Sequence, residues 1–154
     1  MNKKILPPEI VKFIKENGVM TLATSDSEPW VCTLYYGTDE NLTLYLVTDP
    51  NSVHGKMIEK NPNVAFNIFD SHTKVTQPKK GIQGKGICTQ VKDFKEVAKG
   101  LMLWHKANPG NEARITIEAI KKWKDTQIYK IKPTYLKFFN KELYGKDAYC
   151  IWEL

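Results

Sequence analysis

Long apolar runs are absent from the sequence. The best candidates, such as residues 42–47, are far shorter than the roughly 20 apolar residues that a membrane-spanning helix needs. The chain starts with basic residues, as a signal peptide does, but Pro7, Pro8 and Glu9 follow before any apolar segment can form. We therefore expect a soluble protein without an export signal and without a membrane partner.

Cysteine and histidine are scarce. Cys32, Cys88 and Cys150 are odd in number and widely spaced, which argues against a disulfide framework and against a clustered zinc site. His72 and His105 have no partner at metal-ligand spacing, and no nearby residue in the sequence would activate Cys32 as a nucleophile. We predict reduced thiols in a cytoplasmic protein and no metal site.

Arginine is nearly missing as well, since Arg114 is the only one. The net charge of +6 comes from lysines that are spread along the chain, with short clusters only at Lys79–Lys80 and at residues 121–124. A nucleic-acid surface would need a basic stripe with exposed aromatic residues between the cations. The composition therefore predicts no nucleic-acid partner and slightly favours a phosphate-bearing small ligand.

The 154 residues, of which 42% are hydrophobic, suit one domain spanning residues 1–154. Helical spacing of apolar residues, or a capping residue, predicts helices over 8–17, 52–61, 93–107 and 115–124. Runs rich in β-formers predict strands over 19–24, 30–36, 42–47, 64–69, 82–91, 127–131, 135–139 and 148–152. Glycines in the run 82–91 indicate bulges or a close approach of another backbone. This order predicts a small, mainly β barrel with helical decoration rather than a parallel α/β sheet.

The segment from Tyr45 to Lys56 is the most informative stretch for function. A predicted strand ends in Thr48, and Ser52 is placed to cap a helix whose first turn carries His54 and Lys56. Free N–H groups at that terminus, two hydroxyls and two potential cations would suit a phosphate. The alternative is an ordinary capped helix with two surface cations.

The order of several segments resembles the FMN-binding split barrels of the pyridoxamine 5′-phosphate oxidase-like family, especially the small bacterial members with a His-Gly pair in the phosphate loop. The segments are residues 19–24 with 29–31, the run from Thr48 to Ala65 with His54-Gly55 and Asn61-Pro62, and residues 81–86. The likeness runs in family order over about 70 residues. It implies a split β-barrel that binds FMN at the interface of a homodimer.

The resemblance also assigns residues. Val31, Cys32 and Thr33 would border the flavin ring or ribityl chain, Val47, Thr48 and Asp49 would follow the third strand, and Ser52 with His54 would meet the phosphate. His54 stands where many relatives have a lysine or arginine, and Lys56 would compensate for the lost charge. Gln83 would contact the polar edge of the flavin, unless it simply faces solvent, and Trp123 would shield the ring, unless it is a core residue.

These assignments predict a flavin-dependent oxidoreductase, with a small-molecule redox substrate that the sequence does not identify and NAD(P)H as a candidate donor. The alternative is a flavin- or haem-binding protein without turnover. True pyridoxamine 5′-phosphate oxidases also carry a Glu-Phe-Trp-Gln run and an Arg-Leu-His run near their C-terminus, and neither run is present here. We therefore do not expect an efficient pyridoxamine 5′-phosphate oxidase.

Overall fold

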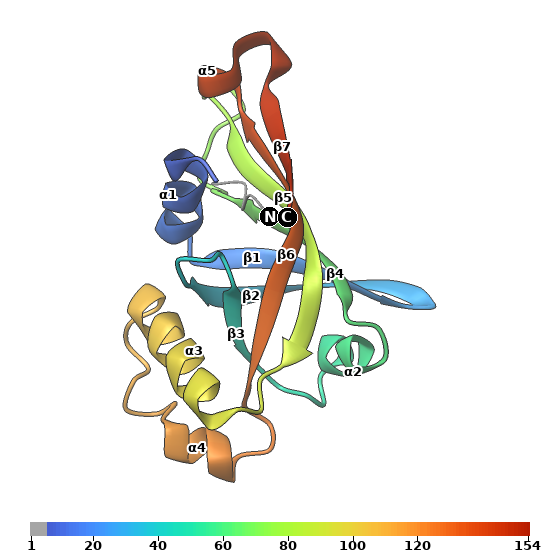
Figure 1. Cartoon of the computed structure of the whole chain (residues 1–154), viewed down its shortest axis with the longest axis vertical. Helices are drawn as coiled ribbons and strands as arrows, with labels where there is room; N and C mark the ends of the chain where they lie inside the picture. The colour runs from blue at the N-terminus through green and yellow to red at the C-terminus, as the bar shows by residue number, and fades with distance from the viewer. Residues whose placement is uncertain (1–5) are drawn as a thin grey trace.

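An antiparallel sheet that closes on itself organises the computed structural model, which describes residues 6–154 (Figure 1). The strand order is β3-β2-β1-β4-β5-β6-β7, and β3 also pairs with β6. The six strands from β1 to β6 therefore form a barrel, and β7 lies outside the closure. The strands are β1 (Val19–Asp26), β2 (Glu28–Thr38), β3 (Leu44–Thr48), β4 (Asn63–Phe69), β5 (Lys80–Gln90), β6 (Gln127–Asn140) and β7 (Tyr149–Glu153). The predicted split-barrel fold class is confirmed.

Helices cover the barrel from several sides. They are α1 (Pro8–Glu16), α2 (Val53–Lys60), α3 (Phe94–Ala107), α4 (Ile117–Lys122) and α5 (Lys141–Tyr144), with the 3-10 turn η1 (Gly145–Asp147). Figure 1 shows α3 and α4 together at one end, α1 toward the other, and the long β5–β6–β7 ribbon running up to α5. No helix within residues 6–154 is long and apolar enough to cross a membrane.

Two apolar clusters hold these layers together. The barrel interior contains Leu22, Leu46 and Phe66, and α1 adds Ile10 and Ile14 from one end. A second cluster lies between the barrel wall and the helix pair α3 and α4, and includes Tyr45, Leu101, Ile120 and Ile128. Tyr45 and Leu46 belong to different clusters although they are neighbours in β3, because successive strand residues point to opposite faces.

The glycines of β5 make room inside the barrel, as the sequence indicated. A Cβ at Gly84 would overlap the ring of Phe66, which lies opposite on β4. The register of β5 against β6 shifts between Lys85 and Gly86, so Thr134 is an extra residue on β6. A bulge therefore occurs beside Gly86, as the glycines indicated, but its extra residue is on β6 rather than in the run 82–91.

Several predicted boundaries were wrong. Residues 127–131 and 135–139 form one continuous strand, because the bulge accommodates Pro133 without breaking the ladder. Leu42 lies in a turn with φ of 60° rather than in β3. The β1–β2 hairpin turns tightly at Ser27, so Pro29 belongs to β2. The short helix α5 was not predicted.

Candidate functional site

The turn between β3 and α2 is held by its own hydrogen bonds. The Asn51 N–H donates to Asp49 Oδ1 at 2.8 Å, and the Ser52 hydroxyl donates to the Asp49 carbonyl at 2.6 Å. Ser52 Oγ also accepts the Gly55 N–H at 3.1 Å, which makes Ser52 the N-cap that the sequence predicted. The N–H groups of Val53 and His54 have no partner among residues 6–154, and groups in this position are available to an anion.

Gly55 lets the first turn of α2 lie against this loop. A Cβ at position 55 would be 2.5 Å from the Asp49 carbonyl oxygen and 2.6 Å from that of Pro50. Any larger side chain would push the start of the helix away from the loop. The glycine of the His-Gly pair therefore has a steric reason, independent of any ligand.

His54 is half-buried and bonded to the end of β3. Its Nε2 lies 2.7 Å from the hydroxyl oxygen of Thr48. Burial lowers the pKa of His54, and the nearby Asp49 carboxylate partly opposes this shift. The ring is therefore mostly neutral at pH 7. When the Thr48 hydroxyl donates to Nε2, Nδ1 carries the proton and can donate to an anion. Lys56, one helical turn after Ser52, is exposed.

Three other predicted residues lie on the outward side of the barrel. Val31 and Thr33 alternate with inward residues along β2, and both are exposed. Thr33 is opposite Thr21, which is in register with Asn67, and Asn67 is opposite Gln83. Residues paired in register share one face of a sheet, so Thr33 and Gln83 are in the same cross-strand row. Val31 begins the next row.

The remaining predicted residues point elsewhere. Cys32 packs against the barrel interior, where burial raises the pKa of its thiol, so only its backbone lies beside Val31 and Thr33. Val47 packs into the cluster beneath α3 and α4. Trp123 ends α4, is 38% exposed, and accepts a hydrogen bond on its carbonyl from Gln127 at 2.8 Å. Gln127 is the cross-strand partner of Thr48, which brings Trp123 toward the β3–α2 turn.

Asn67, which lies between Thr21 and Gln83 in the outward row, was not among the predicted site residues. The signal was present in the alternation of β4, where Val64, Phe66 and Ile68 are buried and the residues between them are exposed. Since β4 is in the middle of the sheet, its exposed side had to be part of the same surface as Gln83.

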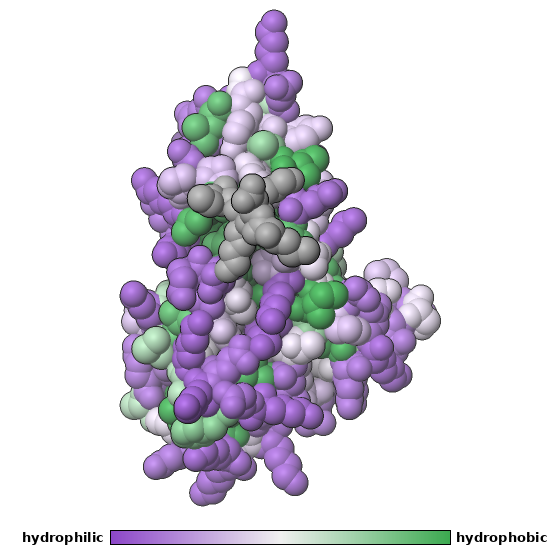
Figure 2. Space-filling view, viewed as in Figure 1, coloured by the Kyte–Doolittle hydropathy of each residue, from purple (hydrophilic) through white to green (hydrophobic). Residues whose placement is uncertain are grey.

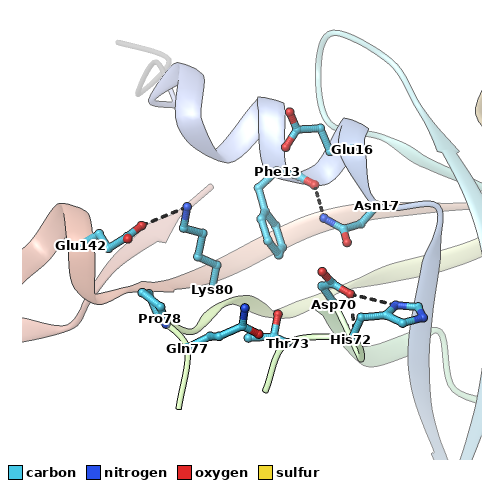
Figure 3. A pocket seen from close by; sticks show the side chains of 10 residues that line it. All are labelled: Phe13, Glu16, Asn17, Asp70, His72, Thr73, Gln77, Pro78, Lys80 and Glu142. Atoms are coloured by element: carbon cyan, nitrogen blue, oxygen red, sulfur yellow. Dashed lines mark hydrogen bonds and ion pairs between the residues drawn. The ribbon is translucent and has the colours of Figure 1, made fainter. Parts of the chain in front are cut away.

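Two cavities have none of the predicted site residues in their lining. The larger, about 610 Å³, is a polar cleft between α1 and the loop joining β4 to β5 (Figure 3). Within its lining, Lys80 Nζ is 3.1 Å from Glu142 Oε2, and His72 Nδ1 is 3.2 Å from Asp70 Oδ1. The second, about 410 Å³, lies between the starts of α3 and β6 and includes Phe94, Ile120 and Lys121. Within residues 6–154, no group of three or more histidine, cysteine, aspartate or glutamate side chains is arranged to hold a metal ion.

Comparison with known proteins agrees with this architecture. The sequence model of a family described as "Pyridoxamine 5′-phosphate oxidase" matches residues 6–140. The UPF0306 protein YE0465 of Yersinia enterocolitica is 35% identical over 95 residues, which cover 57% of this chain and 60% of that protein.

Solved structures share the fold at low sequence identity. The heme binding protein of Mycobacterium smegmatis superimposes with a TM-score of 0.74 at 15% identity, over 97% of this chain and 60% of that one. HutZ, the heme storage protein of Vibrio cholerae, has a TM-score of 0.66 at 20% identity, over 83% of this chain and 89% of that one. The chain thus spans about 60% of the length of YE0465 and of the M. smegmatis protein.

Proposed function

Because the chain belongs to the pyridoxamine 5′-phosphate oxidase family, we propose that it binds FMN and acts as a flavin-dependent oxidoreductase in the form of a homodimer. The observation that carries this proposal is the phosphate-sized group of donors at the start of α2. Two free N–H groups and the His54 ring gather there on a loop that is fixed by its own hydrogen bonds, including those of the Ser52 cap. Such preorganised donors suit a dianionic phosphate monoester.

The outward face of the sheet supports the proposed homodimer. Val19, Val31, Tyr35 and Phe69 are between 40% and 62% exposed on neighbouring strands of this face. The side of the molecule seen in Figure 2 is mostly hydrophilic, with several small apolar areas, one of them where β4 and β5 lie in Figure 1. Large apolar side chains exposed on both sides of the polar row are typical of an interaction surface, and a second copy of the chain is the occupant we propose.

In this arrangement the chain binds and orients, while the flavin supplies hydride or electron transfer when it is bound. Gln83 has an amide that both donates and accepts, which suits the alternating donors and acceptors along the polar edge of a flavin. Thr33 and Asn67 extend this polar row. The second copy would exclude water from the other side of the ring.

Titration with FMN, FAD and riboflavin tests the proposal, with flavin fluorescence as the signal. We expect FMN to bind at least tenfold more tightly than riboflavin, because riboflavin lacks the phosphate. FAD should bind more weakly than FMN. Its second phosphate would need a second anion site, which this loop does not offer among the described residues, and its adenosine would have to be accommodated as well. Equal affinity for FMN and riboflavin would refute the phosphate site.

Haem is a second candidate, since two structural neighbours are described as haem-binding and haem-storage proteins. His72 is the residue that would suit this role. Its ring is 94% exposed at the rim of the larger cleft, and Nδ1 lies 3.2 Å from Asp70. A carboxylate on one ring nitrogen commonly orients a metal-binding histidine through the other.

Absorption spectroscopy separates the two candidates. A haem complex would give a Soret band that His72→Ala abolishes and His54→Ala leaves unchanged. An FMN complex would instead show flavin absorption bands, and His54→Ala would weaken flavin binding whereas His72→Ala would leave it unchanged.

A further inference from the structure

Three lysines project from the outward side of β5 and β6, namely Lys85, Lys132 and Lys137. The ammonium of Lys85 lies 5.5 Å from the centre of the Tyr135 ring, and that of Lys137 lies 4.2 Å from the centre of the Tyr149 ring. None of the three forms an ion pair within residues 6–154. Lys130, on the same strand, differs in that it is bound to Glu96 at 2.7 Å.

Lys85 and Lys137 are diagonal neighbours across β5 and β6. Lys137 is directly opposite Gln83, and Lys85 follows Gln83 by two residues on the same side of β5. Diagonal neighbours of this kind are about 7–8 Å apart at the backbone, within reach of one anion for two flexible lysines. The extra residue Thr134 on β6 occurs beside Lys85, and bulges commonly redirect side chains next to functional sites.

The charge of these lysines conflicts with an interface made only of protein. An ammonium group that a second copy covers loses its hydration, and this is unfavourable unless a negative charge replaces the water. The aromatic rings offset part of this loss through their negative faces. Glu153, opposite Tyr135, is exposed on this face without an ion pair among the described residues, but one carboxylate does not balance three lysines.

We propose that Lys85 and Lys137 bind the anionic group, a carboxylate or a phosphate ester, of the small-molecule substrate held between two copies of the chain. The inference rests on the proposed homodimer. Since Gln83 is the residue assigned to the flavin edge, an anion between the two lysines is held next to the ring. The substrate is then an anionic molecule rather than a neutral quinone or nitro compound.

The test measures how anions affect the dimer. The full chain, loaded with FMN, is diluted from micromolar to nanomolar concentration at constant pH and ionic strength, in chloride, acetate or inorganic phosphate. A ligand that binds only the dimer lowers its dissociation constant. We expect acetate or phosphate to lower this constant at least tenfold relative to chloride. The more effective anion shows whether the anionic group of the substrate is a carboxylate or a phosphate ester. In parallel, the side-chain amide of Gln83 is followed by NMR during the same titrations.

The double variant Lys85→Met, Lys137→Met keeps the aliphatic bulk and removes both charges, and its dimer should no longer distinguish the anions. Lys124→Met, an exposed lysine after α4, should respond like the unaltered chain. An equal response in the double variant would assign the effect to bulk salt and overturn the inference. So would a Gln83 signal that does not move. A chain that stays monomeric by light scattering in chloride, acetate and phosphate overturns the homodimer, and this inference with it.

Discussion

Replacement of His54 by alanine should weaken FMN binding in a manner that depends on pH. The lost contact is a hydrogen bond from the ring to a charged phosphate, worth about 1.5–3 kcal/mol. This corresponds to a loss of roughly 10-fold to 150-fold in affinity. The ring already lies 2.7 Å from Thr48, so little reorganisation is needed before it can donate from its other nitrogen. Riboflavin should lose no affinity, because it has no phosphate.

The direction of the pH dependence follows from the burial of His54. Burial lowers the pKa of the free ring, so the ring is neutral in the unliganded protein over most of the accessible range. A bound phosphate would favour the imidazolium and raise the pKa of His54 in the complex. FMN binding then takes up a proton, and affinity is greatest at low pH and falls as pH rises through the pKa of the complex.

Fluorescence titrations from pH 5.5 to 8 would measure this effect. The phosphate of FMN also titrates, with a second pKa near 6. The pH dependence of FMN affinity in His54→Ala therefore reports the titration of the ligand alone. The difference between the two slopes isolates His54. His72→Ala, which alters an exposed ring, is the matched control. If the two histidine variants bind FMN equally well, or the slopes coincide, His54 is only a helix residue and the reasoning fails.

Three further outcomes are expected. Gly55→Ala should destabilise the fold by about 1–3 kcal/mol in urea unfolding, since its Cβ would be 2.5 Å from the Asp49 carbonyl oxygen, whereas Glu59→Ala on the exposed side of α2 should have little effect. Val31→Lys should shift the chain toward monomer in light scattering, because it adds a charge to the apolar outward face; an unchanged mass would place the interface elsewhere. The FMN-loaded protein should oxidise pyridoxamine 5′-phosphate with a kcat/KM below about 10⁴ M⁻¹s⁻¹, because Arg114 is exposed in the loop before α4, and lysines such as Lys85 and Lys137 bind a phosphate without the bidentate geometry by which an arginine orients it.

Local chemistry made some elements predictable. Ser52 marks the start of α2 and the Asn61-Pro62 pair marks its end. Both could be predicted because a capping residue and a proline affect only the backbone within a few residues of themselves. The continuous strand β6 was not predictable in the same way. Its ladder with β5 extends across Pro133 only because the partner strand supports a bulge, and that support comes from residues about fifty positions away.

The same distinction applies to the candidate site. The contacts among Thr48, Asp49, Ser52 and His54 span at most six residues, so the sequence placed them together. Cys32 points inward because it alternates with Val31 and Thr33 along β2. This alternation was visible in the sequence, but all three residues were nevertheless predicted to border the flavin. The lysines over Tyr135 and Tyr149 depend on the β5–β6–β7 register, which no local pattern specifies.

Barrel closure explains why the outward face, rather than a strand edge, is where a second copy should bind. Pairing of β3 with β6 closes the sheet, and the edges that stay free are residues 28–35 of β2, where Pro29 cannot donate to a ladder, and β7, which has only five residues. An added strand would gain few backbone hydrogen bonds there. The outward face offers exposed apolar side chains on β1, β2 and β4, together with the polar row through Asn67 and Gln83. An interface on this face would cover the apolar residues and enclose the row in one step, so flavin binding and dimer formation should strengthen each other.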